Sequence, residues 1–144
     1  MFKHIVLATD GSASAEHAAQ KAVELARIHG AQLTAVFVVD PYPYLGIGEV
    51  NPMGFQAYMA AAQEVSAKAF AHLSDLAKAA GVQLQARLIE DAQVTHGVLQ
   101  AADEVTADLI VVGSHGRGRI EKLVLGSVAA KIVAQSTRPV LVVR

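Results

Sequence analysis

The sequence has 144 residues, a formal net charge of −1, no cysteine and a hydrophobic fraction of 53%. A chain of this length is expected to fold as one domain over residues 1–144, with a core that needs no disulfide. The near-neutral charge argues against nucleic acid as a partner, since proteins that bind a phosphate backbone usually have a large positive excess. No apolar run reaches the ~20 residues that cross a bilayer, so we expect no membrane insertion.

The N-terminus and the histidines exclude two further features. The run "FKHIVLATD" is too short for the apolar part of a secretion signal, so we expect a cytoplasmic protein. The six histidines are scattered and lack the spacing of metal ligands on one helix face. We therefore expect no metal site built from protein side chains, although a metal ion can arrive with a phosphate ligand.

The first half of the chain starts with a strand pattern over residues 4–9, a helix pattern over 13–30 and a strand pattern over 33–39. The helix pattern ends at Gly30, a residue type that commonly terminates helices. Residues 40–55 then hold three of the four prolines and read as a long loop. Such a loop is either a surface excursion or a flap over a site, in which case Tyr42 and Tyr44 cover a ligand or a partner.

The second half continues the alternation with helix patterns over residues 55–80, 93–106 and 127–136, and with strand patterns over residues 82–89, 108–113 and 139–144. Three of the five strand runs are nearly continuous Val, Ile and Leu, which is typical of strands buried on both faces. Residues 82–89 alternate instead, so we place them at an edge of the sheet. Alternating strands and helices predict an α/β fold with a parallel sheet covered on both faces.

Three polar or glycine-rich segments follow predicted strands, namely residues 8–12, 38–41 and 113–127. Ligands of open α/β sheets bind outside the carboxyl ends of the strands, where the strand order reverses. If the first and fourth strands are neighbours, the three segments converge on one crevice.

The segment "GSHGRGRIEKLVLGS" has the composition of an anion site. Glycines at 113 and 116 allow the backbone to adopt positive φ and to approach a ligand closely. Gly126 and Ser127 open a helix, where free N–H groups and the helix dipole favour phosphate. The dinucleotide fingerprint GxGxxG fails because position 121 is Glu, and the string GxxxxGK[ST] does not occur.

The spacing G-x2-G-x9-G-S, together with "TDGS" near the start, "AVFVVDP" in the middle and "RPVLVVR" at the end, resembles the ATP-binding universal stress proteins along essentially the whole chain. The resemblance implies an open five-stranded parallel sheet in the order 3-2-1-4-5, of the Rossmann-like, adenine nucleotide alpha hydrolase-like class. It also implies an ATP site, with Mg²⁺ or Mn²⁺ held by the phosphates. The implied nucleotide-binding positions are Ala8, Thr9, Asp10, Val38, Val112, Gly113, His115, Gly116, Arg117, Gly126, Ser127 and Val128.

Several of these residues have a structural alternative. Asp10 is suited to the ribose hydroxyls, but it is equally suited to an Asx turn or a helix cap. Ser127 can bind phosphate, cap the helix, or do both. Arg117 raises the potential around a phosphate, whereas Arg119 and Lys122 read as a solvated loop face. His115 either contacts a phosphate or is only exposed.

The expected function is therefore that of an ATP-binding regulatory module of the stress response. The alternatives are a slow ATPase or phosphotransferase, for which the sequence offers no clear catalytic base, and an interaction protein that needs no nucleotide. The resemblance further implies a homodimer formed through the apolar edge strand 139–144, since bare edges pair readily. A separate protein partner is also expected for a regulatory module.

Overall fold

The computed structural model describes residues 1–40, 52–90, 92–115 and 125–144, without the side chains of residues 52 and 53. In these ranges five strands form one parallel sheet in the order β3-β2-β1-β4-β5. The fold class and the strand order are therefore confirmed. The strands are β1 (His4–Ala8), β2 (Gln32–Val38), β3 (Leu84–Ile89), β4 (Leu109–Gly113) and β5 (Val140–Val143).

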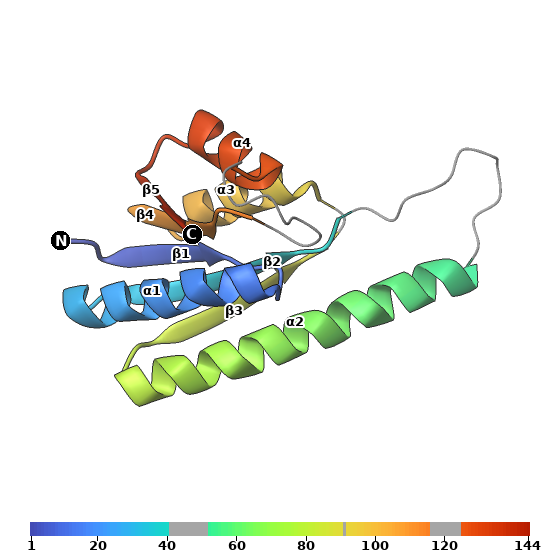
Figure 1. Cartoon of the computed structure of the whole chain (residues 1–144), viewed down its shortest axis with the longest axis horizontal. Coiled ribbons are helices and arrows are strands. Elements are labelled where there is room, and N and C mark those ends of the chain that lie inside the picture. The colour runs from blue at the N-terminus through green and yellow to red at the C-terminus, as the bar shows by residue number, and fades with distance from the viewer. Residues whose placement is uncertain (41–51, 91, 116–124) are drawn as a thin grey trace.

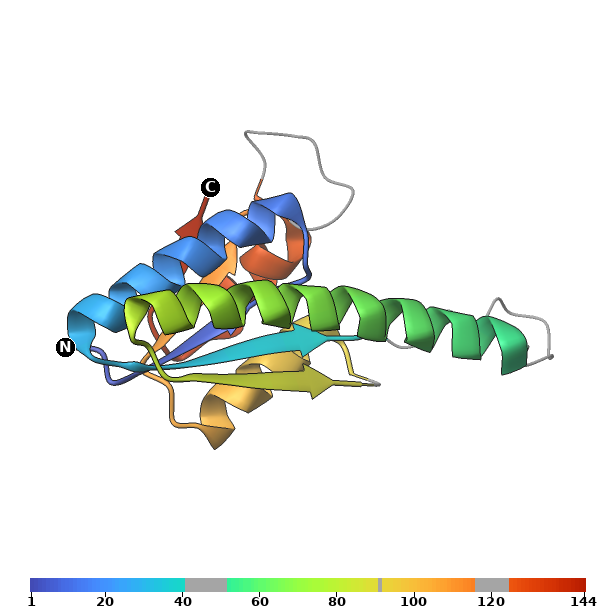
Figure 2. The same cartoon turned by 90° about the horizontal axis from the view of Figure 1, so that it is seen from below.

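Four helices connect the strands and cover both faces of the sheet (Figures 1 and 2). They are α1 (Ala13–His29), α2 (Pro52–Ala80), α3 (Val94–Glu104) and α4 (Ser127–Gln135). Because strand side chains alternate between faces, Ile5 and Leu7 of β1 pack toward α1 and α2. Val6 and Ala8 pack toward α3 and α4. The sheet therefore has a buried core on each face.

Helix α1 is held at both ends by local hydrogen bonds. The Ser12 hydroxyl accepts a hydrogen bond from the N–H of Ala15 at 3.2 Å. At the other end Gly30 adopts φ 64° and ends the helix in the left-handed conformation that favours glycine. Small side chains, fully buried at Ala18, Ala22 and Ala26, let this helix lie close to the sheet. The start of α1 is thereby fixed next to the end of β1.

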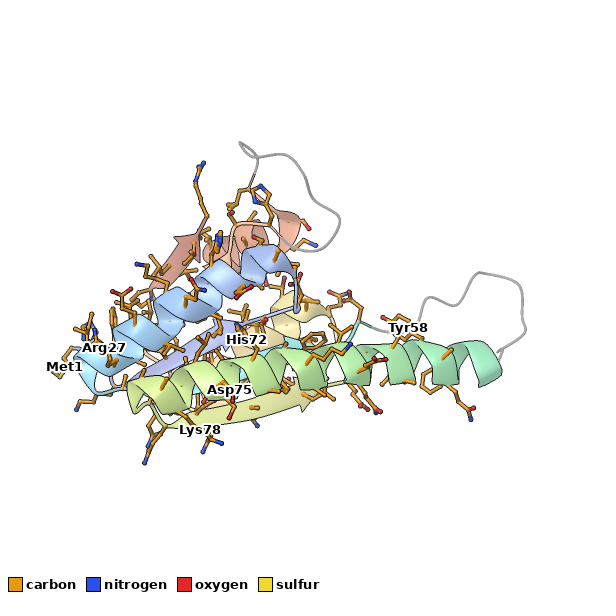
Figure 3. All side chains as sticks on the ribbon, turned by 60° about the horizontal axis from the view of Figure 1, so that its bottom comes forward. Met1, Arg27, Tyr58, His72, Asp75 and Lys78 are labelled. Carbon is orange, nitrogen blue, oxygen red and sulfur yellow. The ribbon has the colours of Figure 1, made fainter. Side chains whose placement is uncertain are left out.

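Helix α2 is longer than predicted and only partly packed. It begins at Pro52, so residues 52–54, expected to be loop, are helical. Its N-terminal half extends past the ends of the strands (Figure 2), which leaves Phe55 40% exposed, whereas Leu73 is 2% exposed. The start of the helix is therefore less buried than its C-terminal half. Figure 3 shows Asp75 and Lys78 on the C-terminal half of α2, where both residues are exposed.

Residues 41–51, with Tyr42 and Tyr44, lie outside the described residues, so the flap stays a prediction. The predicted edge position of residues 82–89 is confirmed, because among the described residues β3 pairs only with β2, and its side chains are half-buried or exposed. Strand β5 forms the other edge, and its four residues are half-buried. No helix in the described ranges is long and apolar enough to cross a membrane.

Candidate functional site

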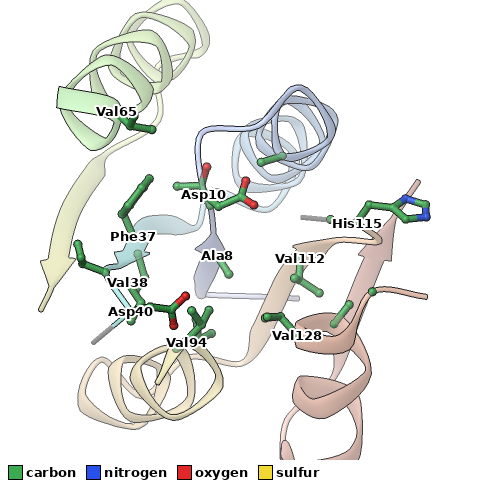
Figure 4. Close-up of a pocket in the computed structure, with 18 of the residues that line it drawn as sticks. Ala8, Asp10, Phe37, Val38, Asp40, Val65, Val94, Val112, His115 and Val128 are labelled. Atoms are coloured by element: carbon green, nitrogen blue, oxygen red, sulfur yellow. The ribbon is translucent and has the colours of Figure 1, made fainter. Parts of the chain in front are cut away.

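A cavity of about 550 Å³ opens at the carboxyl ends of β1, β2 and β4 (Figure 4). Its volume lies within the ~300–1,000 Å³ typical of small-molecule sites. Strand β1 has β2 as its neighbour on one side and β4 on the other. The crevice therefore forms where the strand order reverses. Described residues from all three of the segments that the sequence predicted to converge line this cavity.

All the predicted site residues that the structure describes line this cavity: Ala8, Thr9, Asp10, Val38, Val112, Gly113, His115, Gly126, Ser127 and Val128. Gly116 and Arg117 lie outside the described residues, as do Arg119, Glu121 and Lys122. The structure thus brings the predicted positions together, while their roles in binding stay predictions.

The wall that sequence reasoning missed comes mainly from α2 and α3. It comprises Phe37, Tyr58, Ala61, Ala62, Val65, Val94 and Val98, and beside it lies Asp40 of the predicted segment 38–41. Figure 4 shows Phe37, Val38 and Val65 on the side of the cavity opposite Val112 and Val128, with Val94 between the two groups. Apart from Asp40 and Tyr58, the end of the cavity beside β2 and α2 is therefore apolar, and the other end faces the start of α4. Tyr58, Ala62 and Val65 recur at the spacing of one helix face. This pattern was the signal in the sequence that could have predicted the contribution of α2 to the wall.

The main chain of Val38 faces the crevice. The N–H of Thr9 donates to the carbonyl of Val36 at 3.0 Å, and the N–H of Val39 donates to Ile89 of β3 at 2.8 Å. Successive residues of a strand direct their N–H and C=O groups to alternate sides, so those of Val38 point to the β1 side. Because the β1–β2 pairing ends at Ala8 and Val36, Val38 offers a donor and an acceptor beyond the end of β1.

Asp10 forms the Asx turn that the sequence left open as one of its two roles. Its Oδ1 accepts a hydrogen bond from the N–H of Ser12 at 2.9 Å, and Gly11 between them adopts φ 75°. The same residue lines the cavity. The turn fixes the carboxylate beside the start of α1, which is a suitable position for binding sugar hydroxyls.

The start of α4 supplies free main-chain donors, but not from the residue we expected. The N–H of Gly126 donates to the carbonyl of Ser114 at 2.7 Å, so the expectation that this amide is free for a ligand is wrong. The N–H of Ala130 is the first in the helix to donate to a carbonyl four residues earlier, that of Gly126, at 2.9 Å. Ser127, Val128 and Ala129 therefore present N–H groups without an intrahelical acceptor, as at any helix start.

Glycine is required at 126 because of crowding. A Cβ there would lie 2.8 Å from the carbonyl oxygen of Ser114, too close for any real contact. Gly126 itself is the N-cap of α4 with φ −61°, and no side chain caps the helix. The alternative role of Ser127 as a cap is therefore wrong, since it is the first helical residue. Its hydroxyl stands at the edge of the cavity.

At Gly113 the expected left-handed conformation is absent. The described glycines with positive φ are Gly11, Gly30 and Gly81. A Cβ at Gly113 would meet the carbonyl oxygen of Ser14 at 3.5 Å, an ordinary contact. The next amide, that of Ser114, donates to Val143 of β5 at 2.7 Å. The chain therefore leaves β4 as extended backbone that stays paired with β5.

His115 makes its one described polar contact with its neighbour. Its Nδ1 lies 3.0 Å from the Ser114 hydroxyl, and its Nε2 is buried without a hydrogen-bond partner among the described residues. In Figure 4 the ring points away from Asp10 and Asp40. In this orientation the ring does not face the middle of the cavity. Within the described ranges, no three His, Asp or Glu side chains gather as metal ligands.

Comparison with known proteins agrees with this architecture. The sequence model of the universal stress protein family matches residues 1–144. A universal stress protein of Thermus aquaticus is 39% identical over 148 residues, covering 100% of both chains. The universal stress protein UspA from Lactobacillus plantarum has a TM-score of 0.80 at 25% identity, covering 99% of this chain and 97% of that one.

A further solved structure is described as a universal stress protein in complex with cAMP. It matches with a TM-score of 0.73 at 28% identity, covering 99% of this chain and 97% of that one. Nucleotide binding therefore occurs in a relative with this fold.

Proposed function

Because this chain belongs to the universal stress protein family, we propose that its crevice binds ATP or a related adenine nucleotide and that the protein is a regulatory module of the stress response. The observation that best supports this is the shape of the cavity, apolar at the end of β2 and lined at the other end by the start of α4. A base suits the first end and a phosphate suits the second. The relative described in complex with cAMP supports the same base.

The proposed pose follows the cavity from end to end. The base lies against the main chain of Val38, where a donor and an acceptor face the crevice. The ribose lies at Asp10, whose turn fixes the carboxylate. The phosphates lie at the N–H groups of Ser127, Val128 and Ala129, beside Gly126, which also lines the cavity. Gly116 and Arg117 are proposed to complete the phosphate contacts.

A divalent ion, Mg²⁺ or Mn²⁺, is proposed to bind through the phosphates. The described part of the cavity offers carboxylates only at Asp10 and Asp40, neither of them on α4. Such an ion neutralises phosphate charge when it is bound, and the chain's own contribution is the positive end of the α4 dipole.

The proposed assembly is a cytoplasmic homodimer paired through β5. This strand has a neighbour on one side only, β4, and its residues are Val140, Leu141, Val142 and Val143. An apolar edge with unpaired main-chain groups favours pairing with a second copy. Sedimentation velocity at micromolar concentration tests this part, since a monomer there contradicts it.

Calorimetric titration with ATP, ADP, AMP and adenosine tests the proposed site. If the start of α4 binds the phosphates, affinity should rise with the number of phosphates and fall as salt screens them. Equal affinities for adenosine and ATP would contradict a phosphate site. Absence of binding for all four would contradict the proposed function as a whole.

A further inference from the structure

Asp40 is a carboxylate at the apolar end of the cavity. It follows Val38 and Val39 directly, is exposed, and lines the crevice. Figure 4 shows its carboxylate turned into the cavity, between Val38 and Val94. No described residue forms a hydrogen bond or an ion pair with this carboxylate. It is thus available to a ligand at the end of the cavity opposite α4.

The main chain around Asp40 is fixed on two sides. The N–H of Val39 donates to Ile89 of β3 at 2.8 Å. The hydroxyl of Tyr58 donates to the main-chain oxygen of Asp40 at 2.8 Å, which ties α2 to the end of β2. Burial raises the pKa of Tyr58, and the negative charge of Asp40 raises it further, so this hydroxyl stays a donor. The Asp40 side chain therefore projects from an anchored point.

We propose that Asp40 selects the base, by accepting a hydrogen bond from the exocyclic amino group of a purine that lies against Val38. This inference rests on the proposed nucleotide function and adds its specificity. An ionised carboxylate can only accept hydrogen bonds. Adenine presents an amino donor at position 6, whereas guanine and hypoxanthine present a carbonyl oxygen there. A carboxylate facing that oxygen brings two acceptors together and disfavours the 6-oxo bases.

The expected preference for adenine over a 6-oxo base depends on how exposed Asp40 is. A buried site that hydrogen-bonds a substrate N–H can reject an analogue lacking it by a factor of 10⁴ or more. Water competes for an exposed carboxylate, so we expect the smaller preference of about tenfold for ATP over inosine triphosphate. Inosine triphosphate is the probe because it keeps the ribose and the phosphates and replaces the 6-amino group by oxygen. It also turns N1 from an acceptor into a donor, a change that affects the wild type and both variants alike, so the comparison between the proteins isolates the role of Asp40.

The experiment compares the affinities of ATP and inosine triphosphate for the wild type, Asp40→Asn and Asp75→Asn. The amide of Asp40→Asn has nearly the same size and can both donate and accept, so the tenfold preference should fall to about twofold or less. Asp75→Asn removes the same charge from an exposed position on α2, outside the cavity. That variant should keep the wild-type preference.

The outcomes separate this inference from the proposed function. A wild type that binds both nucleotides equally, or an unchanged preference in Asp40→Asn, would overturn the role of Asp40 and leave nucleotide binding intact. Loss of the preference in both variants would also overturn it, since a general charge effect would then suffice. A wild type that binds neither nucleotide would overturn the proposed function and this inference together.

Discussion

Gly97 of α3 packs directly against Val38 of β2, because the helix has no side chain at the point of contact. A Cβ at position 97 would lie 2.8 Å from Val38 Cγ2 and 3.1 Å from its Cγ1. Val38 is itself buried and β-branched, so it has little freedom to turn away. Gly97 thus sets the distance between α3 and the proposed base site.

Gly97→Ala should destabilise the protein and weaken nucleotide binding. Overpacking costs ~1–3 kcal/mol, while alanine regains about 1 kcal/mol of helix propensity, so we expect a net loss of about 1 kcal/mol in the free energy of unfolding. Urea denaturation measures this loss, and the affinity for ATP should fall several-fold. Adding Val38→Ala removes both colliding methyl groups, so the double variant should be more stable than the sum of the single changes. Strict additivity would contradict the proposed contact.

Glycines 113 and 126 should respond differently to the same change. Gly126→Ala places a Cβ against the carbonyl of Ser114, so the start of α4 must shift, at ~1–3 kcal/mol. Gly113→Ala meets its nearest atoms at 3.5 Å and should change the stability by less than ~0.5 kcal/mol. Thermal denaturation of the pair is the measurement. Equal destabilisation would show that crowding does not explain the glycine at 126.

Asp108 should stabilise the protein in a pH-dependent way. Its carboxylate accepts hydrogen bonds from the N–H groups of Lys3 at 2.8 Å and His4 at 3.0 Å, joining the start of β1 to β4. Burial alone would raise its pKa, but these two N–H groups lower it below its ordinary value of 3.8. A carboxyl whose pKa is lower in the folded state stabilises the fold above pH 3.8, and this contribution disappears as the pH falls through the folded-state value.

Asp108→Asn should therefore cost about 1 kcal/mol at pH 7, the low end for hydrogen bonds to a charged group after solvent screening. The difference from the wild type should shrink as the pH falls from 3.8 toward 2. Denaturant titrations at several pH values measure this difference in the free energy of unfolding. A difference that stays constant across this range would rule out the ionised form as its cause.

The two halves of α2 should contribute unequally to stability. Leu73 is 2% exposed and packs in the core beside α1 and β1, so Leu73→Ala should cost ~2–4 kcal/mol. Phe55 is 40% exposed on the part of the helix that extends past the sheet. Phe55→Ala should cost less than about 1 kcal/mol in spite of its larger side chain. Comparable losses in urea denaturation would show that the N-terminal half is packed as tightly as the rest.

The fold could be predicted because its signals are local. The continuous apolar runs of β1, β2 and β4 reflect burial on both faces, and the alternation in β3 reflects its edge position. The strand order itself came from a resemblance to a known family, since no local pattern encodes which strands are neighbours. The convergence of the three polar segments followed from that order, and the individual site residues came from the same resemblance.

The features that the sequence did not reveal depend on distances between segments. The Gly126 amide donates to the Ser114 carbonyl because α4 starts close to the end of β4. No spacing of residues in the sequence specifies that distance. Asp40 lies at the start of a segment that reads as a loop. No pattern in the sequence shows that Tyr58, eighteen positions later, anchors its main chain. The exposure of Phe55 follows from the length of α2 relative to the sheet, although its apolar spacing is that of a buried stripe.

The central claim is that one nucleotide occupies the crevice with its base at β2 and its phosphates at α4. Backbone amide NMR of ¹⁵N-labelled protein, titrated separately with ATP and with adenosine, tests it most directly. We predict that both ligands shift the resonance of Val38, and that only ATP strongly shifts those of Ser127, Val128 and Ala129. Saturating ATP that leaves the three α4 amides unshifted would contradict the claim.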